Sequence, residues 1–159
     1  MGGYIALQLA ATHPARVRQV VTLGTKFDWS PEVAAGVGRM FDPEKILLKV
    51  PQLADQLARA HGPDHWKLVC QSTAAFLNDL GTGHGLPADT FARITCPVTI
   101  GWGDQDTMVT EAESRRVAGE ILLGKFQMLV GVKHPIEQVD GATLAKFLTA
   151  EFAANNTPT

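Results

Sequence analysis

Two types of side chain that cooperate in proton transfer occur in the last third of the sequence. Asp104 and Asp106 follow the apolar run 97–103, and His134 follows the next apolar run, 126–130. A carboxylate bonded to one ring nitrogen of a histidine fixes its tautomer, so that the other nitrogen can take a proton from a nucleophile. The pattern therefore predicts an acid–base pair.

Each of these residues also has a simpler explanation. Asp106 could cap the turn after its strand, and Asp104 is expected to bond backbone N–H groups nearby, although it remains the rival acid. A lone histidine is more often a structural hydrogen-bonding residue. His61 and His65 have metal-like spacing, but glycine and proline interrupt the helix that would align them, so no metal site is predicted.

An acid and a base on successive loops require two neighbouring parallel strands, because the carboxyl ends of such strands meet at one edge of the sheet. The β-branched run 17–23 and the apolar runs 97–103 and 126–130 are the expected strands. Thr110 with Glu113 forms a capping-box signature for a helix to about residue 122, and a last helix is expected over 141–153 with Leu144, Phe147, Leu148 and Phe152 on one stripe. The fold class is α/β, with about three parallel strands and flanking helices.

Strand signals disappear between residues 29 and 93. Helices punctuated by proline are expected instead, over 31–40, 43–49, 51–61 and 64–80, followed by a glycine-rich loop. We interpret residues 29–93 as an inserted helical cap, and residues 1–28 and 94–159 as the core; the tail 155–159 is expected to fray. The large apolar side chains expected either to line a substrate pocket or to pack inside the cap are Trp29, Met40, Phe41 and Trp66, with Met108 beside the acid.

Composition narrows the class of partner. The chain has 159 residues, 45% hydrophobic and 19% charged, with a net charge of −2, so a buried core is expected and a basic field for nucleic acid or an anionic membrane is not. The spacing of Cys70 and Cys96 suits two buried thiols in a reducing compartment rather than zinc. With no signal-like or spanning segment, a cytoplasmic protein acting on a small neutral substrate without a cofactor is expected.

Three motifs in order resemble the α/β-hydrolase family. The opening MGGYIALQLAATHPARV is similar to the part of that family's G-x-S-M-G-G elbow that follows the serine. Gly103–Asp106 resembles its G-x-x-D acid motif, which favours Asp106 over Asp104, and Gly131–His134 resembles its histidine loop. The resemblance implies a partial α/β-hydrolase fold beginning one residue after the nucleophile.

The resemblance also implies roles. A serine before Met1 would be the nucleophile, the backbone N–H of Met1 would lie in the oxyanion hole, His134 would be the base and Asp106 its orienting acid, acting on an ester-like carbonyl substrate. The chain alone, interpreted as a truncated reading frame, is then expected to be inactive. Two alternatives stay open. One is a non-catalytic half that forms a homodimer, or pairs with its missing half, through the bare strand edge at 17–23. The other is a dehalogenase or C–C hydrolase on the same scaffold.

Overall fold

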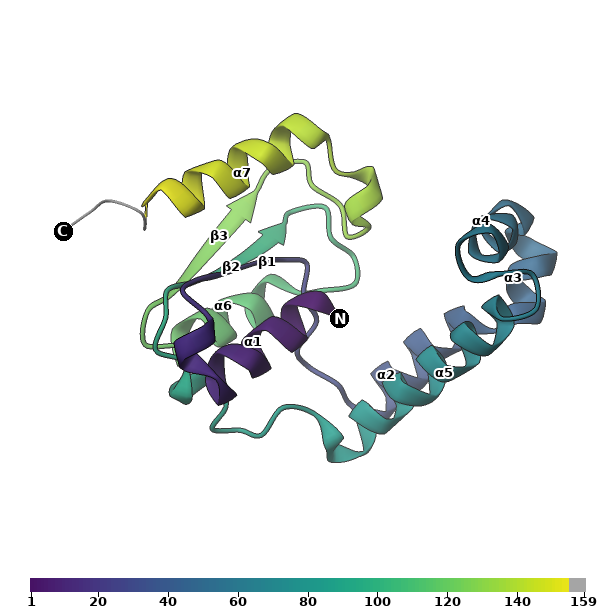
Figure 1. Cartoon of the computed structure of the whole chain (residues 1–159), viewed down its shortest axis with the longest axis horizontal. Coiled ribbons are helices and arrows are strands. Elements are labelled where there is room, and N and C mark those ends of the chain that lie inside the picture. Colours follow the sequence, from purple (N-terminus) through teal and green to yellow (C-terminus); the bar gives the residue numbers. More distant parts are fainter. Residues whose placement is uncertain (155–159) are drawn as a thin grey trace. The chain divides into compact units, whose positions relative to one another are not determined.

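The computed structural model describes residues 1–154 and contains a parallel sheet flanked by helices (Figure 1). The expected fraying of the tail lies outside the described residues. The elements, in chain order, are α1 (Gly2–Thr12), η1 (Pro14–Arg16), β1 (Val20–Leu23), α2 (Pro31–Gly38), η2 (Arg39–Phe41), α3 (Pro43–Lys49), α4 (Pro51–His61), α5 (Trp66–Asp79), η3 (Leu80–His84), η4 (Phe91–Arg93), β2 (Val98–Gly103), α6 (Glu111–Glu120), β3 (Gly124–Leu129), η5 (Ile136–Gln138) and α7 (Gly141–Ala154).

The sheet has three strands in the order β1-β2-β3, all parallel, which confirms the predicted fold class. Every residue of β2 is buried, as expected for a central strand covered on both faces. β1 begins at Val20 rather than at residue 17, because Pro14–Arg16 forms a 3₁₀ turn that is closed by a bond from Val17 N–H to the Pro14 carbonyl. β3 begins at Gly124, two residues earlier than expected, where it pairs with Val98.

Helices cover both faces of the sheet, with α1 and α6 on one side and α7 on the other (Figure 1). The larger core lies under α1 and α6, and its fully or nearly fully buried members include Leu7, Ala10, Val20, Val98, Ile100, Val117 and Ile121. On the opposite face, Phe147 of α7 packs with Leu129, Val132 and the half-buried side chains Val21, Leu23, Leu144 and Leu148. Phe152, expected on the same stripe, is 43% exposed and is not part of this cluster.

Helix α1 is buried on one face only. Leu7 and Ala10 are completely buried against the sheet. Ile5 and Leu9 are exposed, because they lie on the opposite face of the helix, four residues apart. An apolar stripe on α1 is thus left facing outward.

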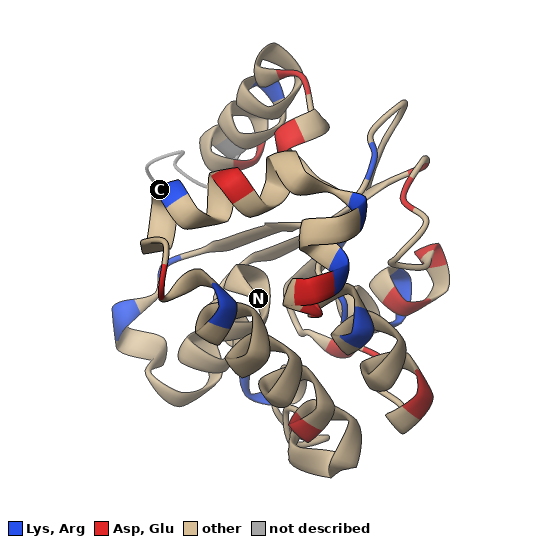
Figure 2. Cartoon of the chain, turned by 90° about the vertical axis from the view of Figure 1, so that its right-hand side faces the viewer, with Lys and Arg blue, Asp and Glu red and all other residues tan. Residues whose placement is uncertain are grey.

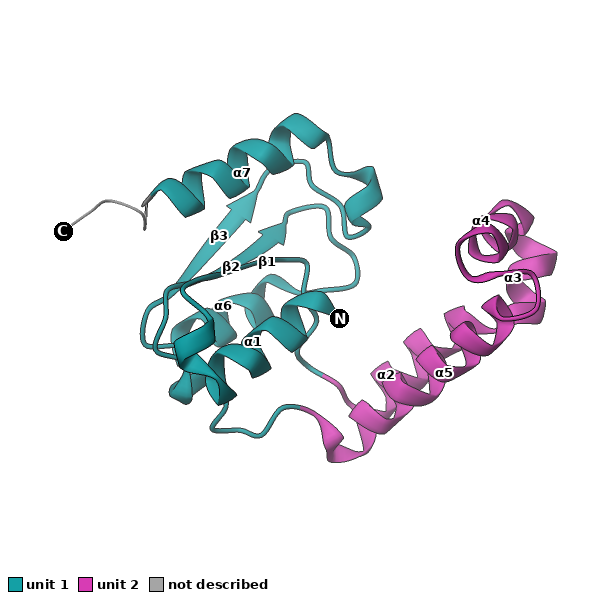
Figure 3. Cartoon of the chain, viewed as in Figure 1, with its two compact units in different colours: residues 1–28, 86–159 teal, residues 29–85 magenta. Residues whose placement is uncertain are grey.

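The chain divides into two compact units (Figure 3). The sheet unit comprises Met1–Asp28 and Leu86–Thr159, and the helical unit comprises Trp29–Gly85. The second boundary therefore lies after residue 85 rather than after residue 93. The reason is that Phe91 is buried in the main core and packs edge-on against Phe27, with ring centroids 5.9 Å apart.

The helical unit follows its prolines. Pro31, Pro43 and Pro51 each occupy the first position of a helix, where a missing N–H costs nothing. Ile46, Ala54, Trp66 and Cys70 form the core of this unit. The expected glycine loop begins with a π-type helical turn, Leu80–His84, in which Gly83 takes a φ of 96°.

Charges of both signs are interspersed along the helices (Figure 2), in keeping with the small net charge. Within residues 1–154, none of the helices combines the length and the apolar character that a membrane crossing requires.

Candidate active site

Asp106 is held in the tight turn after β2. Its side chain is only 1% exposed, and one carboxylate oxygen, Oδ1, accepts hydrogen bonds from the backbone N–H groups of Met108 (2.8 Å) and Val109 (2.9 Å). These bonds satisfy a buried carboxylate and fix its plane. The second oxygen, Oδ2, is left for another partner.

That partner is His134, whose Nδ1 lies 2.9 Å from Asp106 Oδ2. An ionised carboxylate can only accept, so Nδ1 carries the proton and Nε2 of the neutral ring is the acceptor nitrogen. The His134 side chain is 27% exposed, so the ring can be approached from solvent. The pair has the geometry of a base oriented by an acid.

The two loops are tied together by their backbones as well. Asp104 N–H donates to the Leu129 carbonyl (3.1 Å), and Gln105 N–H donates to the Val132 carbonyl (3.0 Å). The Asp104 carboxylate accepts from Gly131 N–H at 2.6 Å. Asp104 thus bonds a backbone N–H as expected, but one on the loop after β3, 27 residues away, rather than one in its own turn. Asp106 is the aspartate that contacts the histidine.

Gly24 directly follows β1 and lies against the pair. It has a φ of 59°, and a Cβ placed there would be 3.2 Å from Asp106 Oδ2 and 3.5 Å from His134 Nδ1. Both the left-handed backbone and the close approach require glycine.

A cavity of about 500 Å³ opens beside this pair, within the sheet unit. It is lined by residues of α1, by β1 and the turn after it, by the His134 loop and by α7: Met1, Gly2, Gly3, Ala6, Val21, Thr22, Leu23, Gly24, Thr25, His134, Ile136, Glu137, Leu144, Phe147 and Leu148. Its walls come from helices on both faces of β1, and β2 pairs with one side of β1 only. The cavity therefore lies along the outer edge of β1.

Met1 stands at the N-cap of α1, and its carbonyl accepts from Ile5 N–H at 3.1 Å. It lines the same cavity as His134. Gly3 explains why this end of α1 can approach β1 so closely, since a Cβ at that position would lie 2.1 Å from Thr25 Oγ1.

The remaining predicted substrate residues lie in different surroundings. Met108 is half-buried in the sheet unit, two residues from Asp106. In the helical unit, Met40 is exposed, Phe41 packs against the core of the unit, and Trp66 is part of that core at 4% exposure. Trp29 is half-buried. Their role toward a substrate stays a prediction.

In the part of the chain that the structure describes, no group of three histidine, cysteine or acidic side chains has the arrangement of a metal site. α4 ends at His61, and Gly62, with a φ of 91°, separates it from α5, so His61 and His65 do not share a helix. Cys70 and Cys96 are buried free thiols whose pKa values are raised by that burial.

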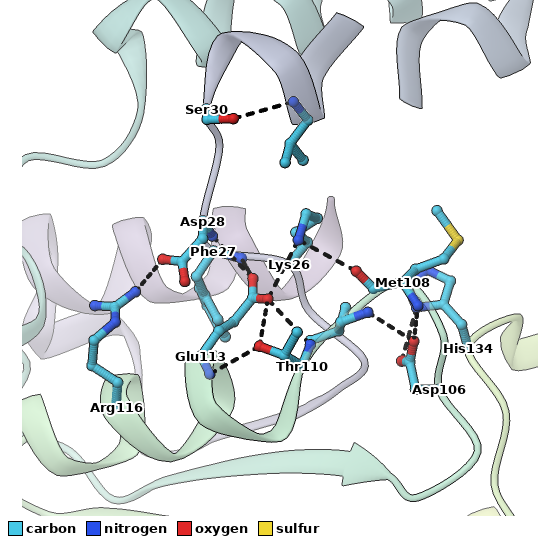
Figure 4. Close-up of polar contacts among 12 residues, drawn as sticks. Lys26, Phe27, Asp28, Ser30, Asp106, Met108, Thr110, Glu113, Arg116 and His134 are labelled. Atoms are coloured by element: carbon cyan, nitrogen blue, oxygen red, sulfur yellow. Dashed lines mark hydrogen bonds and ion pairs between the residues drawn. The ribbon is translucent and has the colours of Figure 1, made fainter. Parts of the chain in front are cut away.

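Sequence reasoning missed a buried ion pair next to the acid. The capping box is confirmed, but Glu113, 3% exposed, also accepts from the N–H groups of Phe27 (2.6 Å) and Asp28 (3.0 Å) and pairs with Lys26 at 3.3 Å (Figure 4). Desolvation raises the pKa of the Glu113 carboxyl, but three backbone hydrogen bonds and the charge of Lys26 outweigh it, and the net pKa lies below its ordinary value. In the sequence, Glu113 could be identified only as the capping-box residue of α6. Its spacing from Thr110 does not show that the same carboxylate also accepts hydrogen bonds from the segment after β1.

No protein-family model matches the chain, and no curated protein matches it by sequence. Solved structures do match. NosK from Streptomyces actuosus aligns with 98% of this chain and 66% of its own, at 21% identity and a TM-score of 0.80. MGS-M2, an α/β-hydrolase enzyme from a Medee basin deep-sea metagenome library, aligns with 99% of this chain and 63% of its own, at 15% identity and a TM-score of 0.66.

The enol-lactonase from Burkholderia xenovorans LB400 aligns with 94% of this chain and 63% of its own, at 23% identity and a TM-score of 0.62. The chain thus spans somewhat less than two thirds of the length of these structures. At such identities the likeness establishes the fold. The three parallel strands, their flanking helices and these matches together identify the chain as having a partial α/β-hydrolase fold.

Proposed function

We propose that this chain supplies the acid and the base of a serine-type hydrolase that acts on an ester-like carbonyl substrate. The observation that carries the proposal is the 2.9 Å contact between His134 Nδ1 and the buried Asp106 carboxylate, at the carboxyl edge of a parallel sheet. The fold and its enzyme neighbours, among them an enol-lactonase and a thermophilic esterase, support a hydrolase. The substrate class is carried over from those two proteins as part of the proposal.

In this mechanism the nucleophile is a serine directly before Met1 in a longer protein. His134 Nε2 takes the hydroxyl proton as Oγ attacks the carbonyl carbon, and Asp106 stabilises the imidazolium that forms. The backbone N–H of Met1 donates to the developing oxyanion. His134 then returns the proton to the departing alcohol, and a water molecule activated by the same ring releases the acyl group.

The cavity supports this placement of the nucleophile. Met1 and His134 line it together, and it runs along the free edge of β1. A strand laid parallel to β1 would fill the cavity and end at Met1 beside His134, and α1 would then connect two neighbouring parallel strands as a crossover helix. The strand and the serine would therefore arrive as one segment.

Hydrolysis of p-nitrophenyl acetate tests the proposal. We expect residues 1–159 alone to give no turnover above background, and a longer protein with an in-frame serine before Met1 to be active. In that protein His134→Ala should lower kcat by several orders of magnitude, since the members of a triad act as a unit. His84→Ala, which removes an exposed histidine of the helical unit, is the matched control and should have no effect.

Two outcomes would change the assignment. Turnover by residues 1–159 that His134→Ala abolishes would contradict a nucleophile outside the chain. An aspartate codon before Met1, with activity on haloalkanes, would point instead to a dehalogenase on the same scaffold.

A second candidate function is that of a non-catalytic half that associates through β1. The specific observation in its favour is that, among the described residues, β1 pairs with β2 alone and its other edge lies next to the cavity. Free strand edges recruit further strands. Size-exclusion chromatography of residues 1–159 would give a dimer that dissociates on addition of the preceding segment; a stable monomer would count against the pairing of two copies.

A further inference from the structure

Lys26 and Glu113 form an ion pair close to the candidate acid. Lys26 Nζ lies 3.3 Å from Glu113 Oε2, and the two side chains are only 15% and 2% exposed. Lys26 comes from the segment that follows β1, and Glu113 comes from the first turn of α6. Buried charges of this kind are costly unless they are paired and hydrogen-bonded, so stability alone does not explain why the pair is present.

The second bond of Lys26 provides a reason. Its Nζ also donates to the Met108 carbonyl at 3.3 Å (Figure 4). That carbonyl and the N–H of Val109 belong to one peptide group, and this N–H donates to Asp106 Oδ1 at 2.9 Å. The ammonium group and the acid therefore bind opposite ends of a single peptide.

A cation on the carbonyl oxygen polarises a peptide and makes its N–H a stronger donor. Charges alternate along the whole series: the Glu113 carboxylate, the Lys26 ammonium, the polarised peptide, the Asp106 carboxylate and the His134 ring. Each contact favours the next. Without Lys26, the loop that carries Met108 loses the hydrogen bond that joins its carbonyl to the segment after β1.

We propose that Lys26 is a positioning residue, which acts through the Met108–Val109 peptide to hold the Asp106 carboxylate in line with His134. Glu113 keeps the ammonium group in place. The proposal rests on the proposed function, in which Asp106 and His134 are the acid and the base.

The chain offers a matched control for a purely structural role. Lys125 pairs with the buried Glu151 at 2.7 Å, which is again a lysine on a buried glutamate. It lies at the amino end of β3, whereas His134 follows the carboxyl end of that strand. Lys125→Met therefore removes a lysine from a buried glutamate far along the strand from the acid, although the Lys125 side chain is itself 54% exposed.

The test uses nuclear magnetic resonance on residues 1–159, with two readouts. One is amide hydrogen exchange at Val109, compared with Ile100 in the central strand as a measure of global stability. The other is the downfield Nδ1–H resonance of His134. We expect Lys26→Met to speed exchange at Val109 by at least about tenfold beyond any change at Ile100, because the hydrogen bond from the charged Lys26 Nζ to the Met108 carbonyl is lost. The same variant should broaden or abolish the ring resonance of His134.

Lys26→Arg, which keeps a charged donor, should restore both signals, and Lys125→Met should change Val109 and Ile100 to the same extent. Because Lys26→Met leaves a buried carboxylate without its cation, the double variant K26M/E113Q is the second test. It carries no unpaired buried charge but still lacks the donor to Met108. If exchange at Val109 follows Ile100 and the ring resonance is unchanged in both variants, the proposal is overturned.

The activity of the longer protein separates this inference from the proposed function. In an active protein, Lys26→Met should lower kcat with little change in KM, because it misaligns His134 and leaves substrate binding unchanged. Wild-type kcat in that variant would overturn the positioning role while leaving the hydrolase intact. Absence of any hydrolase activity would overturn the proposed function, and the resonance measurements would still decide whether Lys26 orders the pair.

Discussion

Replacing Glu113 by alanine should lower the free energy of unfolding of the sheet unit by about 3 to 5 kcal/mol, the usual cost of breaking a buried ion pair by removing one partner. The carboxylate is 3% exposed and accepts from three backbone N–H groups as well as pairing with Lys26. Alanine removes every one of these interactions and fills none of the space.

The contributions differ with burial. The N–H of Phe27 is bonded at 2.6 Å in a buried segment and would be left unsatisfied, at about 1 to 3 kcal/mol. The N–H groups of Asp28 and Thr110 belong to exposed residues, so water can replace much of what they lose. Loss of the capping box on α6 adds about 1 kcal/mol. The rest of the ~3 to 5 kcal/mol comes from the Lys26 ammonium group, which loses its counter-ion and keeps its hydrogen bond to the Met108 carbonyl.

Urea unfolding at pH 7 provides the assay. Amide exchange in β2 is the suitable probe, because tryptophans occur in both units and their fluorescence would mix the two transitions. Glu111→Ala is the matched control: it removes a glutamate from the same turn of α6, whose ion pair with Arg115 is exposed and worth at most about 1 kcal/mol. If Glu113→Ala cost no more than Glu111→Ala, the argument that Glu113 anchors the segment after β1 would be refuted.

Three further predictions follow from the same structure. The pKa of Glu113 in the folded protein lies below its ordinary value of 4.5, so its contribution to stability is present above that pH and is lost as the pH falls through the folded value. The difference in unfolding free energy between wild type and Glu113→Gln should therefore shrink in urea titrations below pH 4.5. Gly3→Ala should lower the melting temperature, because a Cβ there would meet Thr25 Oγ1 at 2.1 Å. Gly2→Ala, with open space around it, should be neutral or stabilising by up to about 1 kcal/mol. Equal effects of the two substitutions in calorimetry would contradict the close packing of α1 on β1. Gly24→Ala should cost about 1 to 2 kcal/mol from its positive φ and should displace the acid–base pair, visible as a shifted or missing histidine ring resonance, and a wild-type spectrum would contradict the contact.

Local features of the sequence predicted most elements well. Prolines at the first turn mark the starts of α2, α3 and α4, and the Thr110–Glu113 capping box marks that of α6. These signals work because they act on the backbone within a few residues. Boundaries set by distant contacts were less predictable: β3 begins where Val98 pairs with Gly124, and residues 86–93 join the sheet unit because Phe91 is buried in its core.

At the candidate site, the sequence provided the residue types and their order along the chain, and it named Asp106 and His134 before any distance was known. It left Asp104 as a rival. The structure separates the two aspartates, because Asp104 turns to the Gly131 N–H and Asp106 to the His134 ring. Two residues apart in a turn, the side chains point in different directions, and spacing does not show which one meets the histidine.

The sequence by itself determined the alternation of helices and strands, the helical insertion and the candidate acid and base, since each depends on periodicity, caps and turn residues that neighbours along the chain control. Only the tertiary structure decided that Gly24 lies against the pair and that Lys26 reaches the peptide bonded to Asp106. The physical reason is that Lys26 lies 82 residues from Met108 along the chain, and only the parallel packing of β1 beside β2 brings the ends of these strands together.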